Sequence, residues 1–134
     1  MKLAVTTVLL VCATALSACG SQGVQLKKSN PDYAGAVLFR ERCGGCHTLA
    51  AAGTQGSATT IPNRVKTNGP NFNFRKEKAE QVLYALRNGG FSGAIMPQNI
   101  VVGQQAQAVA EFLAKYSGHS AQHIPSTEIP QSDK

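Results

Sequence analysis

The chain has 134 residues, of which 43% are hydrophobic, 6% aromatic and 15% charged, so its length allows about one domain. Thirteen basic and seven acidic residues give a formal net charge of +6 at pH 7, and no run of Lys and Arg is longer than two. This mild basic bias excludes a nucleic-acid-binding tail. It fits either a surface that attracts acidic partner proteins or an ordinary solvated surface.

The N-terminus has the pattern of an export signal. Met1 and Lys2 precede an apolar run from Leu3 to Leu16, which is 14 residues long. Spanning a bilayer takes about 20 residues, so the run is too short for an uncleaved anchor helix. We therefore predict that residues 1–18 are removed on export.

The end of this run, Leu16-Ser17-Ala18-Cys19, resembles the lipobox of bacterial lipoproteins. The resemblance implies that the mature chain begins at Cys19 with a diacylglyceryl group on its sulfur, and two or more acyl chains make a stable anchor. Removal of residues 1–18 leaves a charge of +5. We expect a lipid-anchored protein on the outer face of the cytoplasmic membrane, or in the periplasm or outer membrane. The alternative is a secreted chain without lipid.

The rest of the chain divides into three parts. Residues 19–30 contain few core-forming side chains and are predicted to be a flexible tether. Residues 31–118 form the domain, and residues 119–134 are predicted to be a disordered tail. The first helix is predicted to begin with Asn30 as N-cap and Pro31 as its first residue, and to run into a pair of cysteines.

The sequence Cys-Gly-Gly-Cys-His at 43–47 matches the C-x-x-C-H signal for covalent haem attachment. On a helical turn, positions i, i+3 and i+4 share one face. Cys43 and Cys46 can therefore each bond one vinyl group of a single haem c, while His47 gives the iron an imidazole nitrogen. The two intervening glycines are expected to leave space for the macrocycle.

Other uses of this motif are less consistent with the chain. A thioredoxin-like site follows a strand, and none is predicted before Cys43. A zinc site needs further ligands, and the domain has no second cysteine pair and no cluster of histidines. A disulfide between residues only three apart closes a trivial loop. Because the pattern is short, a chance match is the remaining alternative.

Two more helices follow a long loop. Residues 48–69 are rich in Ala, Gly and Thr and are predicted to be loop. Helices are predicted over about 75–88, ended by Gly89-Gly90, and over about 104–116, ended by Gly118. No convincing alternating strand is found, so the predicted class is all-α with long loops.

Met96 is predicted to be the second axial ligand of the haem iron. It is the only methionine left after removal of the signal, and it lies in a loop before Pro97, where a core-filling role is less expected than ligation. A thioether ligand favours Fe(II) and raises the reduction potential. An ordinary apolar loop residue is the alternative for Met96. His119 and His123, which follow the last helix, are competing ligands but are better explained as solvated tail residues.

Together these features resemble the class I cytochromes c, over essentially all of residues 31–118. The resemblance implies that Gly35 and Phe39 cross Leu113 and Tyr116 of the last helix. It also implies that the carbonyl of Pro70, in Gly69-Pro70, accepts a hydrogen bond from the proximal histidine and orients it. Tyr84 could reach the Met96 sulfur or a propionate, or be an ordinary half-buried residue.

The resemblance implies an electron carrier that is not itself an enzyme. We expect it to pass single electrons between respiratory redox partners, whose docking surfaces would be acidic. The alternative is a haem c subunit of a larger enzyme complex, such as a terminal oxidase or a periplasmic dehydrogenase. A di-haem peroxidase needs a second C-x-x-C-H, which the sequence lacks, and a ligand-binding sensor needs an open iron position, which Met96 would fill.

Overall fold

The computed structural model describes residues 23–91 and 95–119. The predicted signal at 1–18, the predicted lipidation site Cys19, His123 and the predicted tail from residue 120 onward lie outside these ranges. Within the described part, no helix has both the length and the apolar character needed to cross a membrane.

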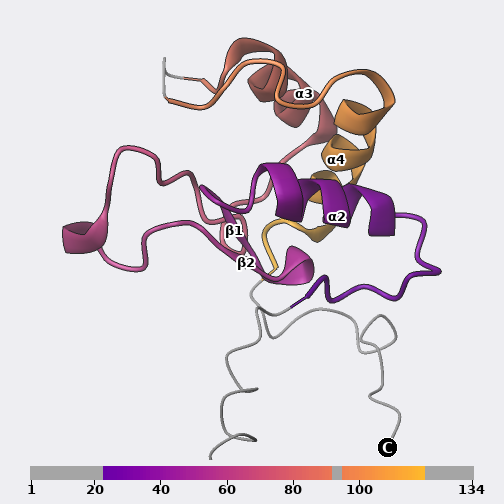
Figure 1. Cartoon of the computed structure of the whole chain (residues 1–134), viewed down its shortest axis with the longest axis horizontal. Helices are drawn as coiled ribbons and strands as arrows, with labels where there is room; N and C mark the ends of the chain where they lie inside the picture. Colours follow the sequence, from indigo (N-terminus) through magenta and orange to yellow (C-terminus); the bar gives the residue numbers. More distant parts are fainter. Residues whose placement is uncertain (1–22, 92–94, 120–134) are drawn as a thin grey trace, which may run out of the picture.

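Three helices form the body of the molecule, as predicted: α2 (Tyr33–Arg42), α3 (Ala79–Asn88) and α4 (Gly103–Tyr116). Figure 1 shows α2 crossing α4, with α3 packed along the other side of α4. The helices present buried apolar side chains to one another, among them Phe39 of α2, Val82 and Leu86 of α3, and Val109 and Phe112 of α4. The predicted all-α class is confirmed.

The crossing of α2 and α4 depends on Gly35. A Cβ on this residue would collide with the carbonyl oxygen of Ala108 and would lie 2.9 Å from the Cβ of Phe112. The Phe39 ring packs on the Phe112 ring at 6.0 Å, and Phe112 packs on Tyr116 at 5.2 Å. The resemblance had implied Leu113 and Tyr116 as the α4 side of the crossing. Both are buried, and Phe112, which the resemblance did not include, also meets Gly35 and Phe39.

The start of α2 differs from the prediction. Asn30 and Pro31 were expected at its first turn, but the helix begins at Tyr33. Asn30 still closes the turn before the helix, because its Oδ1 accepts a hydrogen bond from the Asp32 amide at 2.8 Å. This local side-chain bond competes with helical pairing, so the predicted boundary was two residues early.

The other two helices also begin at residues that differ from the predicted ones. The second helix was expected from about residue 75, but α3 begins at Ala79, because residues 75–78 are fixed against the end of α4. The amide of Glu77 donates to Ser117 Oγ at 2.8 Å, and Lys76 Nζ donates to the Ala114 carbonyl at 2.6 Å. Gly89, at φ +72°, ends α3 as predicted. α4 begins one residue earlier than expected.

The segment predicted as loop contains short ordered elements. The strands β1 (Thr48–Leu49) and β2 (Thr54–Gln55) pair antiparallel across the 3₁₀ turn η2 (Ala50–Ala52), and a second turn, η3 (Ile61–Asn63), follows. Side-chain bonds reinforce the hairpin: Thr54 Oγ1 accepts from the Leu49 amide at 2.9 Å. Two-residue strands carry no readable alternation, so the sequence could not predict them.

The predicted tether is also shorter than expected. Leu26 is only 2% exposed and belongs to the core, and Val24 packs against that core. The backbone of Gln25 donates to the Ala51 carbonyl at 2.9 Å. The packed part of the chain therefore includes residues 24–26, which had been assigned to the tether.

Candidate haem site

The five residues of the motif leave α2 as one more helical turn. The amides of Cys46 and His47 both donate to the carbonyl of Cys43, at 3.0 and 2.9 Å. The bond from His47 joins residues i and i+4, so the two thiols and the imidazole start from the same turn, as the spacing predicted. The two cysteines are partly exposed and are not joined in a disulfide.

Gly44 of the motif has a packing role that the sequence did not predict. A Cβ on Gly44 would lie 2.5 Å from the Arg40 carbonyl oxygen and 2.7 Å from Thr54 Cγ2 of β2, so Gly44 is needed for packing against the hairpin. A Cβ on Gly45 would meet nothing within 4 Å. Gly56, just after the hairpin, approaches the backbone of the motif so closely that a Cβ would lie 2.6 Å from the Cys46 amide nitrogen. The glycines bring the hairpin and the motif together.

The ring of His47 is 9% exposed and is held on several sides. Its Nδ1 lies 3.1 Å from the Pro70 carbonyl oxygen, as the resemblance implied. A Cβ on Gly69 would collide with the imidazole, so only glycine lets this loop lie against the ring. Phe72 stacks on the ring with centroids 4.8 Å apart and planes at 16°. The imidazole therefore has little rotational freedom.

The hydrogen bond to Pro70 fixes the tautomer of His47. A carbonyl oxygen can only accept, so Nδ1 carries the proton and the lone pair of Nε2 is left for a metal. Burial lowers the pKa of His47, an effect that the bond to Pro70 opposes and the charge of Arg75 reinforces. The ring is consequently neutral at neutral pH, which is the form that can bind a metal.

The environment of Cys43 disfavours thiol redox chemistry. Burial, followed by the proximity of Cys46, raises the pKa of Cys43 to about 12. Catalytic C-x-x-C cysteines have lowered pKa values, because the thiolate is the reactive form. Among the described residues, no group of three or more His, Cys, Asp or Glu side chains could hold a metal ion, which gives a zinc site no support there.

Met96 lies in the loop between α3 and α4, partly buried against the core. This loop is fixed to the end of α3. The Asn99 amide donates to the Leu86 carbonyl at 2.7 Å, and a Cβ on Gly89 would lie 2.8 Å from the Met96 carbonyl oxygen. His119, the competing ligand within the described part, is exposed beyond the end of α4.

A comparison with protein families matches residues 33–117 to the cytochrome c family. The chain belongs to the cytochrome c family. This cytochrome is similar to the c-type cytochrome SorU of Sinorhizobium meliloti, with 32% sequence identity and a TM-score of 0.52 over 66% of this chain and 93% of that one. No curated protein matches it. The family identity implies covalent haem c and electron transfer.

The donor set of this cytochrome fits haem c. Two unbridged thiols and an imidazole with a free Nε2 start from one turn, and these are the groups that thioether attachment and iron ligation require. Apolar side chains that would suit a large apolar cofactor or a partner protein lie exposed on α3 and the loop after it. Tyr84 stacks on Phe91 at 5.3 Å, and the two residues are 51% and 58% exposed.

Tyr84 therefore has a neighbour that the sequence analysis did not consider. Both earlier interpretations, a reach to Met96 or a propionate and a half-buried helix residue, omitted Phe91. Phe72, which stacks on His47, and Gly56, which packs on the motif, were not predicted from the sequence either. Phe72 follows Gly69-Pro70 by two residues. Because that loop was expected to contact the histidine, the short spacing was the available signal that Phe72 also lies near the ring.

Proposed function

We propose that this cytochrome is an exported, lipid-anchored carrier that passes one electron at a time between respiratory redox partners outside the cytoplasmic membrane. Cys43 and Cys46 form the two thioether bonds to one haem c, His47 is the proximal ligand and Met96 the distal ligand. Acyl groups on Cys19 hold the mature chain to the membrane. When bound, the haem supplies the iron that changes between the ferrous and ferric states.

The bond between His47 Nδ1 and the Pro70 carbonyl carries the proposal. It leaves the Nε2 lone pair for the iron and keeps the ring from turning. A hydrogen bond to the far nitrogen also raises the basicity of a ligating imidazole, which helps to stabilise the ferric form. Gly69 and Phe72 exclude water from the ring.

Met96 is proposed as the distal ligand because it is the only methionine among the described residues, it is partly buried, and its loop is fixed to α3. Two filled axial positions let an electron enter and leave with little movement of the ligands and keep O₂ from the iron. A net positive charge suits encounter with acidic partner surfaces, which we retain as the expected partner chemistry.

The ligand assignment is tested with Met96→Ala in the haem-loaded protein. We expect the reduction potential to fall and the ferrous form to bind carbon monoxide rapidly, because an open position replaces a soft ligand. Val102→Ala, at an exposed position next to the same loop, is the control and should change neither property. An unchanged potential in Met96→Ala would refute the assignment.

One observation favours the second candidate function, a haem subunit of a larger enzyme complex. Exposed apolar clusters mark interaction surfaces, and the Tyr84–Phe91 pair is such a cluster. Purification after mild solubilisation distinguishes the two. A stable complex supports the subunit, whereas an isolated, freely exchanging monomer supports the carrier.

A further inference from the structure

The chain becomes fixed to the domain very soon after the proposed lipidation site. Gln25 is bound through its backbone to Ala51 of η2, and its side chain donates to the Gly23 carbonyl at 2.7 Å. Leu26 follows as a fully buried core residue. We call the surface formed by Gly23–Gln25 and η2 the anchor face.

The remaining tether is shorter than the domain is wide. Cys19 and Gly23 are four positions apart, so their Cα atoms can be separated by at most about 14 Å. A domain of this size is roughly 30 Å across. Because the tether is so short, the anchor face cannot lie on the side of the domain that points away from the membrane.

We propose that the anchor face lies against the surface of an anionic phospholipid bilayer, and that this contact sets the orientation of the haem relative to the membrane. The inference rests on the proposed acylation of Cys19. It adds that the protein is held in one orientation, whereas a flexible tether of twelve residues would let the domain turn freely.

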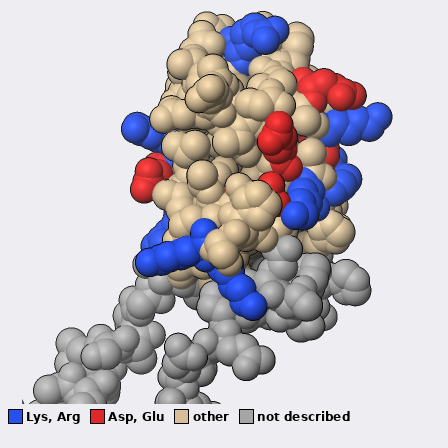
Figure 2. Space-filling view, turned by 90° about the vertical axis from the view of Figure 1, so that its right-hand side faces the viewer, with Lys and Arg blue, Asp and Glu red and all other residues tan. Residues whose placement is uncertain are grey.

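Basic side chains lie close to the anchor face. Lys27 and Lys28 are exposed, and Arg40 lies near Gly23, with a guanidinium nitrogen 3.8 Å from the position of a Cβ there. Figure 2 shows basic side chains along the lower edge of the described molecule. Phosphate headgroups attract lysine and arginine within about a Debye length, so these side chains favour an anionic surface.

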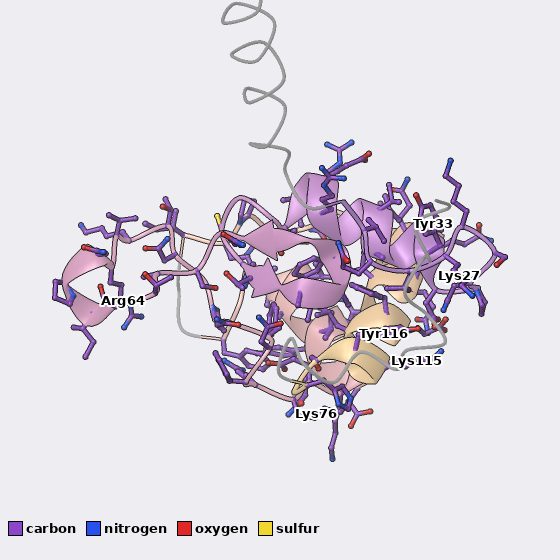
Figure 3. The ribbon with its side chains drawn as sticks, turned by 90° about the horizontal axis from the view of Figure 1, so that it is seen from below. Lys27, Tyr33, Arg64, Lys76, Lys115 and Tyr116 are labelled. Atoms are coloured by element: carbon purple, nitrogen blue, oxygen red, sulfur yellow. The ribbon has the colours of Figure 1, made fainter. Side chains whose placement is uncertain are left out.

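Of the two acidic side chains at the ends of α2, Asp32 and the exposed Glu41, the first is already engaged. Asp32 pairs with Lys115 at 2.7 Å, and Figure 3 shows Lys27 and Lys115 at the same end of the molecule when it is seen from below. The pair reduces the repulsion that Asp32 would otherwise exert on the headgroups. The net charge of the side chains near the anchor face therefore stays positive.

The orientation has a consequence for partner docking. Figure 1 shows the start of the described chain below α2, and α3 with the loop that follows it at the opposite edge. With the anchor face on the lipid, Met96 and the Tyr84–Phe91 pair face the aqueous phase. Redox partners would then approach from that side.

The test compares the acylated, haem-loaded full-length protein with a variant that carries a flexible Gly/Ser spacer of about 12 residues between Gln22 and Gly23. Such a spacer has a reach of roughly 20 Å, which frees the domain. Both proteins are bound to supported bilayers of phosphatidylglycerol and phosphatidylethanolamine, and the dichroism of the haem absorption is measured with polarised light. The matched control carries the same spacer after His119.

We expect the wild type and the control to give the same dichroic ratio, clearly different from that of a random distribution, and the N-terminal spacer to remove most of this difference. Lys27→Gln with Lys28→Gln should lower the dichroism on the anionic bilayer and leave it unchanged on pure phosphatidylcholine. Equal dichroism with and without the N-terminal spacer would overturn the proposal. An unchanged ratio in the lysine variant on the anionic bilayer would overturn the part played by charge.

Mass spectrometry of the mature N-terminus separates this inference from the function on which it rests. A chain without acyl groups on Cys19 would overturn the lipid anchor and the orientation together. An acylated chain that shows no dichroism would overturn the orientation alone, and the tethered carrier would stand.

Discussion

At the scale of single residues, this site depends on glycines whose hydrogen atoms face other atoms of the protein. Gly69 faces the His47 ring, and Gly44 faces Arg40 and Thr54. The sequence motif indicated which residues bind the cofactor but not why glycines separate the cysteines. That information lies in the hairpin that packs on the motif, which has no signal in the local sequence.

Gly44→Ala and Gly45→Ala form a matched pair within the motif. The first adds a Cβ at 2.5 Å from a carbonyl oxygen, and the second adds one in open space. We expect Gly44→Ala to lower the free energy of unfolding of the haem-loaded protein by about 1–3 kcal/mol, as overpacking does. Gly45→Ala should cost less, because its Cβ meets no atom of the protein within 4 Å. Denaturant titration measures both, and equal losses would contradict the role assigned to Gly44.

Gly69→Ala tests the support of the proximal ligand. The new Cβ would collide with the imidazole, so either the loop with Pro70 or the His47 ring must move. We expect a shift in the reduction potential together with a fall in stability of about 1–3 kcal/mol. An unchanged potential, measured by redox titration, would show that the loop does not position the ring.

At the scale of elements, the three helices were predictable and their first residues were not. Amphipathic spacing and the terminal glycines identified α3 and α4, since both signals are local. The start of α3 depends on bonds to a distant part of the chain, such as the one between Glu77 and Ser117, 40 residues apart, and the start of α2 depends on a local bond to the side chain of Asn30. The short hairpin, too, is held by packing against the motif and not by strand propensity.

The crossing of α2 and α4 gives a sharp test of packing. Gly35→Ala would push α2 away from Ala108 and Phe112, and we expect a loss of about 1–3 kcal/mol despite the better helix propensity of alanine. Glu41→Ala, at an exposed position of the same helix, is the control and should change stability by less than about 0.5 kcal/mol. Thermal unfolding of the haem-loaded proteins gives the comparison, and a Gly35 variant as stable as wild type would contradict the close approach.

The ion pair between Lys115 and Asp32 joins the end of α4 to the start of α2. The hydrogen bond to Asp32, more than any other contact, raises the pKa of Lys115 above its ordinary value. The stabilisation of the fold by this pair is therefore fully present below the ordinary lysine pKa. It is lost as the pH rises through the raised pKa of Lys115. Because Lys115 is half exposed, we expect Lys115→Gln to cost at most about 1 kcal/mol near neutral pH. The difference from wild type should shrink in strongly alkaline solution, and a difference that grew there would contradict the assignment.

At the scale of the whole molecule, the core is small and lies beside the haem site. Phe39 and Phe72 belong to the core and also contact His47. The cytochrome c fold could be predicted from the order of its motifs along the chain. The place where the packed domain begins could not, because Leu26 is an isolated apolar residue in a polar segment.

Loss of both attachment points should therefore affect the entire fold. We expect Cys43→Ala with Cys46→Ala to leave the domain largely unfolded, since a domain of about 90 residues buries only a modest core without its cofactor. Circular dichroism during heating measures this. A cooperative unfolding transition near that of the haem-loaded wild type would contradict the expectation.

The central claim is that Cys43 and Cys46 hold one haem by covalent bonds. The most direct measurement is extraction of the natively matured protein with acidified organic solvent, followed by the absorption spectrum and mass of the polypeptide. The account predicts that the colour stays with the chain and that its mass includes one haem. Complete transfer of the colour to the solvent, with the polypeptide mass unmodified at these cysteines, would contradict it.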